Sequence, residues 1–181
     1  MFRLLFTFAV LTVAIQLFAA EIPDRYWPRW RGPADSGNAA FADCPEKWSK
    51  DDGHLRKVTL PGIGCSTPVV WGDHILLTST QDGQDLALAY DWTGKLVWTA
   101  NIGAGVPGKH RNGSGSNPSI VTDGEHVFAY FKSGNLAALD INGELLWQTN
   151  LQQSYGKLKL YWDQGTSPAL TRRDVIVEVM H

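Results

Sequence analysis

The chain has 181 residues, 44% of them hydrophobic, and a formal net charge of −2 at pH 7. This length is typical of one folded domain, and the apolar content is sufficient for a packed core, which argues against a disordered chain. Because there is no excess of basic residues to neutralise phosphates, the composition also argues against nucleic acid as a partner.

The first twenty residues are apolar, and Arg3 is their only charge. Polar residues interrupt the apolar run, which is shorter than the roughly 20 residues needed to cross a bilayer as an anchor. A positive start followed by an apolar stretch and small residues is typical of a secretory signal peptide. We therefore predict a signal peptide over 1–20, cleaved near Ala19 or Ala20. The mature chain is expected in the periplasm or outside the cell, with no stable membrane span.

Residues 21–65 are predicted to be an N-terminal arm and first strand region. The arm contains "RYWPRWRGP", in which the prolines disfavour a helix. We expect a stiff segment whose Trp27 and Trp30 fill an apolar groove. A platform of aromatic side chains for carbohydrate or a membrane surface is the alternative.

Cys44 and Cys65 are the only cysteines. Export would bring them into an oxidising compartment, where a disulfide between them is plausible. In the loop-entropy model such a bridge would contribute about 3 kcal/mol to stability. Two separate buried thiols are the alternative, because the sequence gives no distance between them.

Two segments share the pattern DxxGxxxW at an offset of 49 residues. In this pattern the aspartate and the glycine fit a type I turn, because the aspartate accepts backbone hydrogen bonds and the glycine tolerates a positive φ. Each segment is therefore predicted to be a β-hairpin whose second strand carries a tryptophan. The repeated residues are Asp91, Gly94 and Trp98 in the first copy and Asp140, Gly143 and Trp147 in the second.

The strands before these hairpins repeat as well. "GDHI" at 72–75 returns as "GEHV" at 124–127, and "TPVV" at 67–70 is echoed by "SPAL" at 167–170. Repeats of about 40 to 50 residues, each with four short strands, are typical of a β-propeller, whose blades bury their faces against one another. We predict an all-β fold over 66–181: a partial β-propeller of about two and a half four-stranded antiparallel blades.

The predicted blades span about 66–102, 117–151 and, for the opening strands of a third, 166–181. The two connections between them are rich in glycine or polar residues and are expected to cross one end of the ring near its central channel. Connecting loops commonly carry function, so binding is expected at this end.

The first connection holds the densest group of donors and titratable side chains, and adjacent blades would bring the second connection beside it. Histidine serves as acid, base or metal ligand, and arginine grips a carboxylate or phosphate at two points. A solvated polar loop is the alternative. The ligand-binding candidates are Lys109, His110, Arg111, Asn112, Asp163, Gln164 and His181.

No catalytic residue and no metal site are predicted. The sequence contains no GxSxG motif, which would place a nucleophilic serine on a sharp turn. "GAGVPG" at 103–108 formally matches a dinucleotide-binding loop. Glycines and a proline follow it instead of a helix, so we interpret it as a connection.

The closures "AxDxxGxxxW", the opening "STPVVWGD" and the arm motif "WPRWRGP" resemble the pyrroloquinoline-quinone-type propeller repeat family over about residues 27–181. In that family a tryptophan at the end of each blade docks against the neighbouring blade. The resemblance implies this structural, blade-docking role for Trp98 and Trp147, which stand at the matching positions.

The resemblance implies two kinds of function. Some members are dehydrogenases that oxidise alcohols or sugars with pyrroloquinoline quinone and calcium, often with adjacent cysteines beside the quinone. Others resemble outer-membrane assembly factors and bind protein without a cofactor. Because Cys44 and Cys65 are not adjacent, we expect an exported non-catalytic scaffold without a cofactor that binds protein or polysaccharide. The alternatives are a fragment of a quinone-dependent dehydrogenase and a carbohydrate-binding module that uses Trp27, Trp30 and Trp162.

About two and a half blades do not close a ring of seven or eight, which would take about 350 to 400 residues. We therefore expect a fragment of a longer reading frame with unpaired strand edges, which favour self-association. The exported segment expressed alone should be poorly soluble or self-associated in size-exclusion chromatography. A sharp monomeric peak with cooperative melting would count against this expectation.

Overall fold

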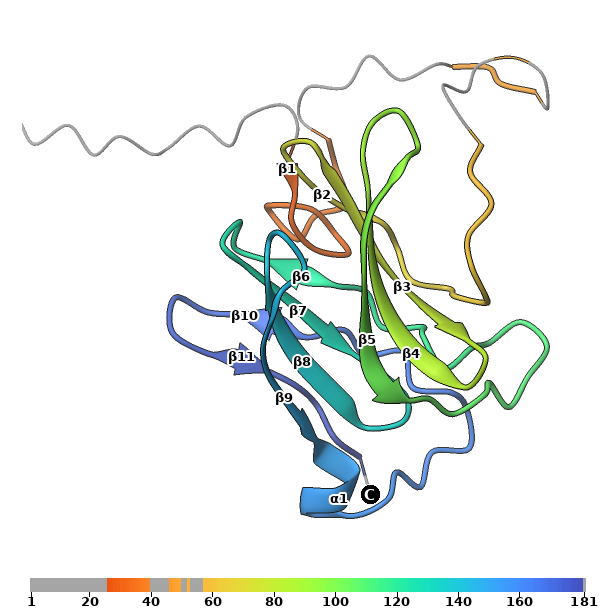
Figure 1. Cartoon of the computed structure of the whole chain (residues 1–181), viewed down its shortest axis with the longest axis vertical. Helices are drawn as coiled ribbons and strands as arrows, with labels where there is room; N and C mark the ends of the chain where they lie inside the picture. The colour runs from red at the N-terminus through yellow and green to blue at the C-terminus, as the bar shows by residue number, and fades with distance from the viewer. Residues whose placement is uncertain (1–25, 40–45, 50–51, 53–56, 181) are drawn as a thin grey trace, which may run out of the picture.

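A computed structural model of the chain describes residues 26–39, 46–49, 52 and 57–180. The predicted signal peptide lies outside these residues, as do Cys44 and His181. Three antiparallel sheets follow one another through the molecule (Figure 1). Within the described part of the chain, no helix has the length and apolar character needed to cross a bilayer.

The first sheet contains β1 (Tyr26–Trp27), β2 (Val69–Trp71), β3 (His74–Gln81), β4 (Gln84–Tyr90) and β5 (Leu96–Ala104). The second sheet contains β6 (Val121–Thr122), β7 (His126–Tyr130), β8 (Asn135–Asp140) and β9 (Leu145–Asn150), and the third contains β10 (Ala169–Leu170) and β11 (Val175–Ile176). Each of the first two sheets is built around four consecutive antiparallel strands. This confirms the predicted partial β-propeller, with two blades and the first strands of a third.

Both predicted hairpin turns are present. Asp91 Oδ1 accepts backbone hydrogen bonds from the residues two and four positions on, at 2.7 and 3.0 Å, and Asp140 Oδ1 does the same at 2.9 and 2.7 Å. Gly94 and Gly143 have φ values of 79° and 88°, a conformation in which a side chain would be strained. The repeated Asp and Gly therefore determine where each outer strand begins.

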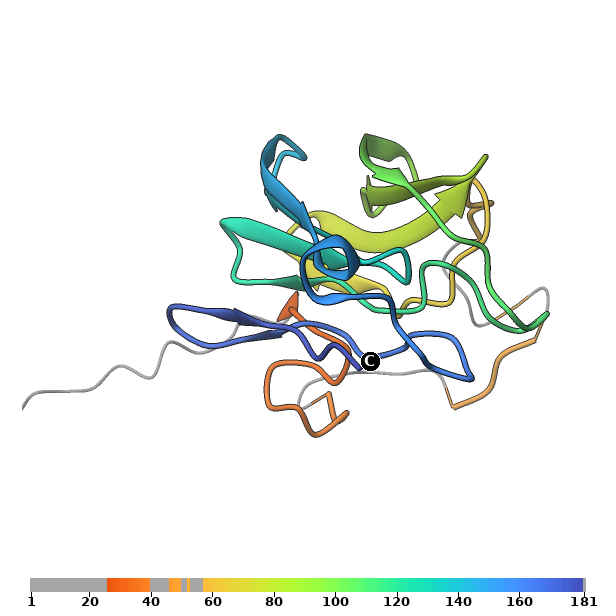
Figure 2. The same cartoon turned by 90° about the horizontal axis from the view of Figure 1, so that it is seen from below.

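The main hydrophobic core lies between the first two blades, which fan out side by side in Figure 2. Strands contribute alternate side chains to it, as the period-two geometry requires. Alanines on β4 and β8 let the two sheets approach closely, while larger side chains from the inner strands fill the space between them. The buried members are Val69, Leu76, Ala87, Ala89, Ile102, Ile120, Val127, Ala129, Phe131, Ala137 and Leu139.

Trp98 joins the outer parts of the two blades. Its indole N–H donates to the carbonyl of Ile141 at 3.1 Å, and its ring lies against Gly143, where an added Cβ would come within 2.5 Å of the ring. Trp147, the equivalent residue of the second blade, is 42% exposed and has Phe128 beside it. Among the described residues the third sheet consists of β10 and β11, so no corresponding turn covers Trp147.

The N-terminal arm crosses the inner edges of both blades. β1 pairs with β2, and the carbonyl of Pro28 accepts a hydrogen bond from the backbone of Thr122 in β6 at 3.0 Å. Trp27 packs against Gly32 of the same arm. Trp30 is 58% exposed, so the expectation that both tryptophans fill a groove is wrong for Trp30.

The second connection begins with one turn of helix, α1 (Leu151–Tyr155). Asn150 caps it, because its side-chain oxygen accepts a hydrogen bond from the backbone of Gln153 at 3.0 Å. Periodicity could not predict so short a helix, since it has no buried face.

A buried carboxyl group, that of Asp85 in β4, also links the two blades. Asp85 is fully buried, and its Oδ2 accepts hydrogen bonds from Ser133 Oγ at 2.5 Å and Asn135 Nδ2 at 3.0 Å. Thr80 Oγ1 donates to Oδ1 at 3.5 Å. Burial raises the pKa of Asp85 to about 6, although these three hydrogen bonds lower it.

The contrast between the two repeated tryptophans gives a matched pair of variants. Trp98→Ala should reduce the free energy of unfolding by about 3 kcal/mol, because it removes a packed ring and leaves a cavity. Trp147→Ala should reduce it by less than about 1 kcal/mol, as an exposed substitution does. Urea unfolding followed by circular dichroism at one fixed protein concentration measures both. Equal losses in the two variants would contradict the docking contact.

Asp85 should make stability depend on pH. Its folded-state pKa lies above the ordinary value of 3.8, so the folded state holds the proton more tightly. Tighter binding of this proton stabilises the folded state most at low pH, and this stabilisation is lost as the pH rises from about 4 through 6. Asp85→Asn keeps the site neutral, and its unfolding free energy relative to the parent should grow by about 2 kcal/mol from pH 4 to pH 7.5. Asp82→Asn, in the neighbouring exposed turn, is the control. A difference that does not change with pH would refute the assignment.

Candidate functional site

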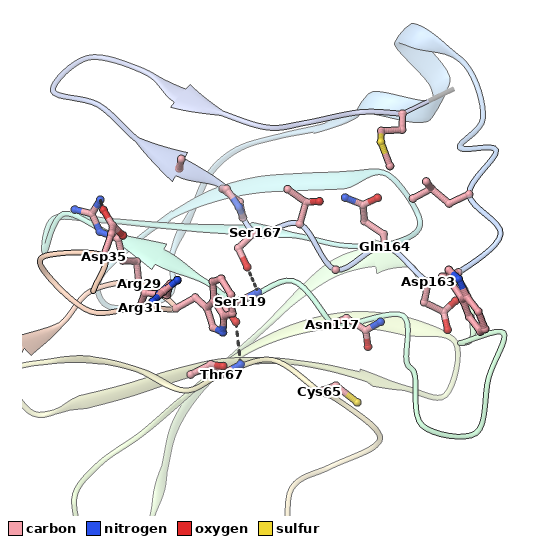
Figure 3. Close-up of a pocket in the computed structure, with 18 of the residues that line it drawn as sticks. Arg29, Arg31, Asp35, Cys65, Thr67, Asn117, Ser119, Asp163, Gln164 and Ser167 are labelled. Atoms are coloured by element: carbon pink, nitrogen blue, oxygen red, sulfur yellow. Dashed lines mark hydrogen bonds and ion pairs between the residues drawn. The ribbon is translucent and has the colours of Figure 1, made fainter. Parts of the chain in front are cut away.

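A pocket of about 910 Å³ lies where the inner strands of the three sheets begin (Figure 3). We call it the inner-strand pocket. Residues of the arm between 29 and 35 line one side, and residues 160–169, which include the end of the second connection, line another. Thr67, Asn117 and Ser119, from the segments that precede β2 and β6, line it as well.

Two serine hydroxyls connect the segments that lead into the inner strands. The backbone N–H of Thr67 donates to Ser119 Oγ, and the backbone N–H of Ser119 donates to Ser167 Oγ, both at 2.9 Å (dashed lines in Figure 3). The same kind of bond thus joins each blade to the next. Sequence reasoning missed this role, although the repeated "TPVV" and "SPAL" carry hydroxyl residues at matching positions.

The arm folds into a tight loop that holds two arginines beside the pocket. Backbone hydrogen bonds from Gly32 to Arg29 and from Gly37 to Arg31, each 2.9 Å long, fix the loop. Arg29 Nη1 lies 3.2 Å from Asp35 Oδ2, while Arg29 Nε is buried and has no hydrogen-bond partner among the described residues.

Arg31 has no carboxylate partner among the described residues. Its Nη2 donates to the carbonyl of Ser36 at 3.1 Å, and its guanidinium carbon lies 5.8 Å from the centre of the Trp30 ring. This distance allows a cation–π contact. Arg31 therefore supplies a positive charge beside an exposed aromatic ring.

Asp163, one of the predicted ligand-binding residues, ties the two connections together. Lys132 Nζ lies 2.6 Å from its Oδ1, and the backbone N–H groups of Lys109 and His110 donate to its carboxylate at 2.9 and 3.4 Å. Burial raises the pKa of Asp163, but Lys132 and these backbone donors together lower it below the usual value. Asp163 is therefore a fixed anion with its partners already in place.

Gln164, the residue after Asp163, differs from it in its hydrogen bonding. The residue is 3% exposed and lines the inner-strand pocket, and its side chain has no hydrogen-bond partner in the described part of the chain. Figure 3 draws its amide group directed into the pocket and away from Asp163. The amide is open to the pocket, where it can donate a hydrogen bond to a ligand and accept one from it.

The remaining predicted residues lie outside the pocket lining. Lys109 Nζ donates to the carbonyl of Leu160, and His110 and Arg111 are exposed. The carbonyl of Asn112 lies 3.5 Å from the thiol of Cys65, which is free and exposed. The first connection thus contacts Asp163 through the backbone N–H groups of Lys109 and His110. Ligand binding by its side chains stays a prediction, and His181 lies outside the described residues.

Exposed aromatic side chains surround the pocket. Trp30 comes from the arm, and Tyr161 and Trp162 come from the second connection, where their rings meet edge to face with centroids 4.8 Å apart. Of the three tryptophans predicted as a carbohydrate platform, Trp30 and Trp162 therefore reach one pocket. Trp27 packs against Gly32 instead.

The carboxylates that line this pocket do not fit a calcium ion. Calcium takes about six to eight oxygen ligands, with carboxylates among them. Asp35 pairs with Arg29, and Asp163 pairs with Lys132. Nowhere in the described ranges do three or more His, Cys, Asp or Glu side chains form a group that could hold a metal.

Apolar side chains are also exposed at the start of the outer strands. β5 and β9 are edge strands of their sheets, and Val97 and Leu146, which occupy equivalent repeat positions, are 49% and 50% exposed. We call the whole set the outer-strand apolar residues. Its members are Leu96, Val97, Leu145, Leu146 and Trp147.

Comparison with known proteins relates the chain to one repeat family. A family model described as outer membrane protein assembly factor BamB matches residues 47–176. No curated protein matches the chain. A quinohemoprotein alcohol dehydrogenase from Comamonas testosteroni is similar at 19% identity and a TM-score of 0.44, over 64% of this chain and 17% of that one.

A europium-containing methanol dehydrogenase is similar at 19% identity and a TM-score of 0.39, over 68% of this chain and 20% of that one. The chain therefore spans a fifth or less of the length of these two solved structures.

Proposed function

This chain belongs to the repeat family described as outer membrane protein assembly factor BamB, and from that membership we propose that it is an exported, non-catalytic β-propeller scaffold that binds a partner protein. Export is supported by the apolar segment at the start of the sequence. The observation that carries the binding role is the set of outer-strand apolar residues.

Large apolar side chains exposed to solvent are candidates for protein interaction. Val97 and Leu146 are about half exposed even though each follows a well-ordered turn and belongs to a regular strand. They recur at the same place in both repeats, so one partner would meet the same chemistry on adjacent blades. Trp147 adds a residue type that often dominates the binding energy of protein interfaces.

The edges of β5 and β9 offer a second means of recognition. Within the described sheets each strand has a hydrogen-bonded neighbour on one side only, which leaves backbone donors and acceptors available on the other. An extended segment of a partner can add to such an edge, with backbone hydrogen bonds supplying affinity and alternate side chains supplying specificity. The blade core and the Trp98 contact hold these edges in a fixed arrangement, which lowers the cost of binding.

Photo-crosslinking in the cells that export this protein tests the proposal. A benzoylphenylalanine residue at Val97 should give one discrete adduct with a partner protein. Excess unlabelled parent protein should suppress the adduct by competition. Leu146→Asp should fail to compete, because a charge replaces an apolar contact, whereas Arg173→Gln on the exposed third sheet should compete as well as the parent.

Either of two results would overturn the protein-binding role. The first is an adduct pattern at Val97 that both competitors suppress equally. The second is no adduct at all, together with dye reduction by the exported protein when pyrroloquinoline quinone and calcium are supplied, which would support the dehydrogenase alternative.

A further inference from the structure

We propose that the inner-strand pocket binds an acidic saccharide, a sugar chain that carries uronate carboxylates. This site is separate from the outer-strand apolar residues assigned to the partner protein, and it does not depend on that assignment. It rests on three features that meet in one cavity: amide groups open to a ligand, exposed aromatic faces and a positive charge that no described carboxylate pairs with.

Two amide side chains have hydrogen-bonding capacity that the protein does not use. Gln164 is nearly fully buried and makes no side-chain hydrogen bond within the described ranges. Asn117 Oδ1 accepts from the backbone and the hydroxyl of Ser114, both at 2.9 Å, but no described residue accepts from its Nδ2. An amide group can donate and accept at once, as a sugar hydroxyl can, so both side chains suit a ligand rich in hydroxyls.

The aromatic side chains supply the apolar part of the same recognition. A pyranose ring has hydroxyls around its rim and C–H groups on its faces, and an aromatic face presents a flat, electron-rich surface to such groups. Trp30 and Trp162 are exposed, line the pocket and come from different segments of the chain. They can therefore contact different parts of one sugar chain.

The charged side chains that line the pocket favour an acidic sugar over a neutral one. Asp35 is compensated by Arg29 and Asp163 by Lys132, which leaves Arg31 as the uncompensated charge among the described lining residues. A guanidinium group binds a carboxylate through two parallel hydrogen bonds. The tight loop of the arm holds Arg31 beside Trp30, so a uronate ring can contact the indole while its carboxylate reaches Arg31.

The arm also makes this pocket a poor site for an extended peptide. A peptide strand would need a free inner edge, but β1 already pairs with β2. The carbonyl of Pro28 also accepts a hydrogen bond from the backbone N–H of Thr122 in β6. Strand addition is therefore blocked on both complete blades, which favours recognition by side chains.

Isothermal titration calorimetry of the exported chain with a short oligogalacturonate tests the inference, and the methyl-esterified form of the same oligomer is the matched neutral probe. We expect the acid form to bind roughly tenfold more tightly, because a charge-assisted hydrogen bond contributes that much to affinity. Arg31→Gln should remove the preference and leave the affinity for the ester unchanged. Gln164→Leu and Trp162→Ala should each weaken binding of both forms.

Matched controls and a competing ligand keep the result interpretable. Arg173→Gln and Trp48→Ala change exposed residues outside the pocket and should leave both affinities unchanged. Leu146→Asp should also leave them unchanged, which separates this site from the protein-binding surface. Equal affinity for both oligomers, no binding of either oligomer, or binding of poly-glutamate as tight as that of oligogalacturonate would overturn the inference.

Discussion

The structure depends on one constraint: a blade of this kind has an apolar face that only another sheet can cover. Strands β2–β5 of the first blade and β7–β8 of the second contribute buried side chains to a common core between the two blades, and each blade shields the apolar face of the other from water. Burial of apolar surface is the main favourable term in folding, so the two blades stabilise each other. Trp98 extends this contact to the outer strands by using Gly143 of the next blade as its packing surface.

The same stacking determines where polar chemistry collects. Because the inner strands of successive blades begin beside one another, the hydroxyl residues before them form hydrogen bonds from blade to blade. The connections cross at the same end, where Asp163 and Lys132 join them through a nearly buried ion pair. Gln164 and Arg31 line the pocket and can still form hydrogen bonds with a ligand. On the outer strands, apolar side chains stay exposed.

Local patterns predicted the blades well, and nonlocal contacts account for what was missed. The spacing of Asp91, Gly94 and Trp98 encodes a turn and a strand within a few residues, so the repeat identified both hairpins. Nothing in the sequence around Tyr26 and Trp27 indicates that the arm pairs with β2, because that contact joins segments far apart in the chain. Asp163 and Gln164 both lie in the connection between the second and third sheets, but these adjacent residues differ in their hydrogen bonding. Lys132 and the backbone N–H groups of Lys109 and His110, all distant in sequence, pair with Asp163, and the sequence near Asp163 does not indicate them.

Hydrogen exchange measured by mass spectrometry over β4 and β8 tests most directly whether the blades form one cooperative unit. These strands lie on opposite sides of the shared core. We expect their amides to have the same protection and to lose it at the same denaturant concentration, as residues of one cooperative unit do. Rapid exchange in one strand while the other stays protected would mean that each blade folds alone, and the packing constraint described above would then be wrong.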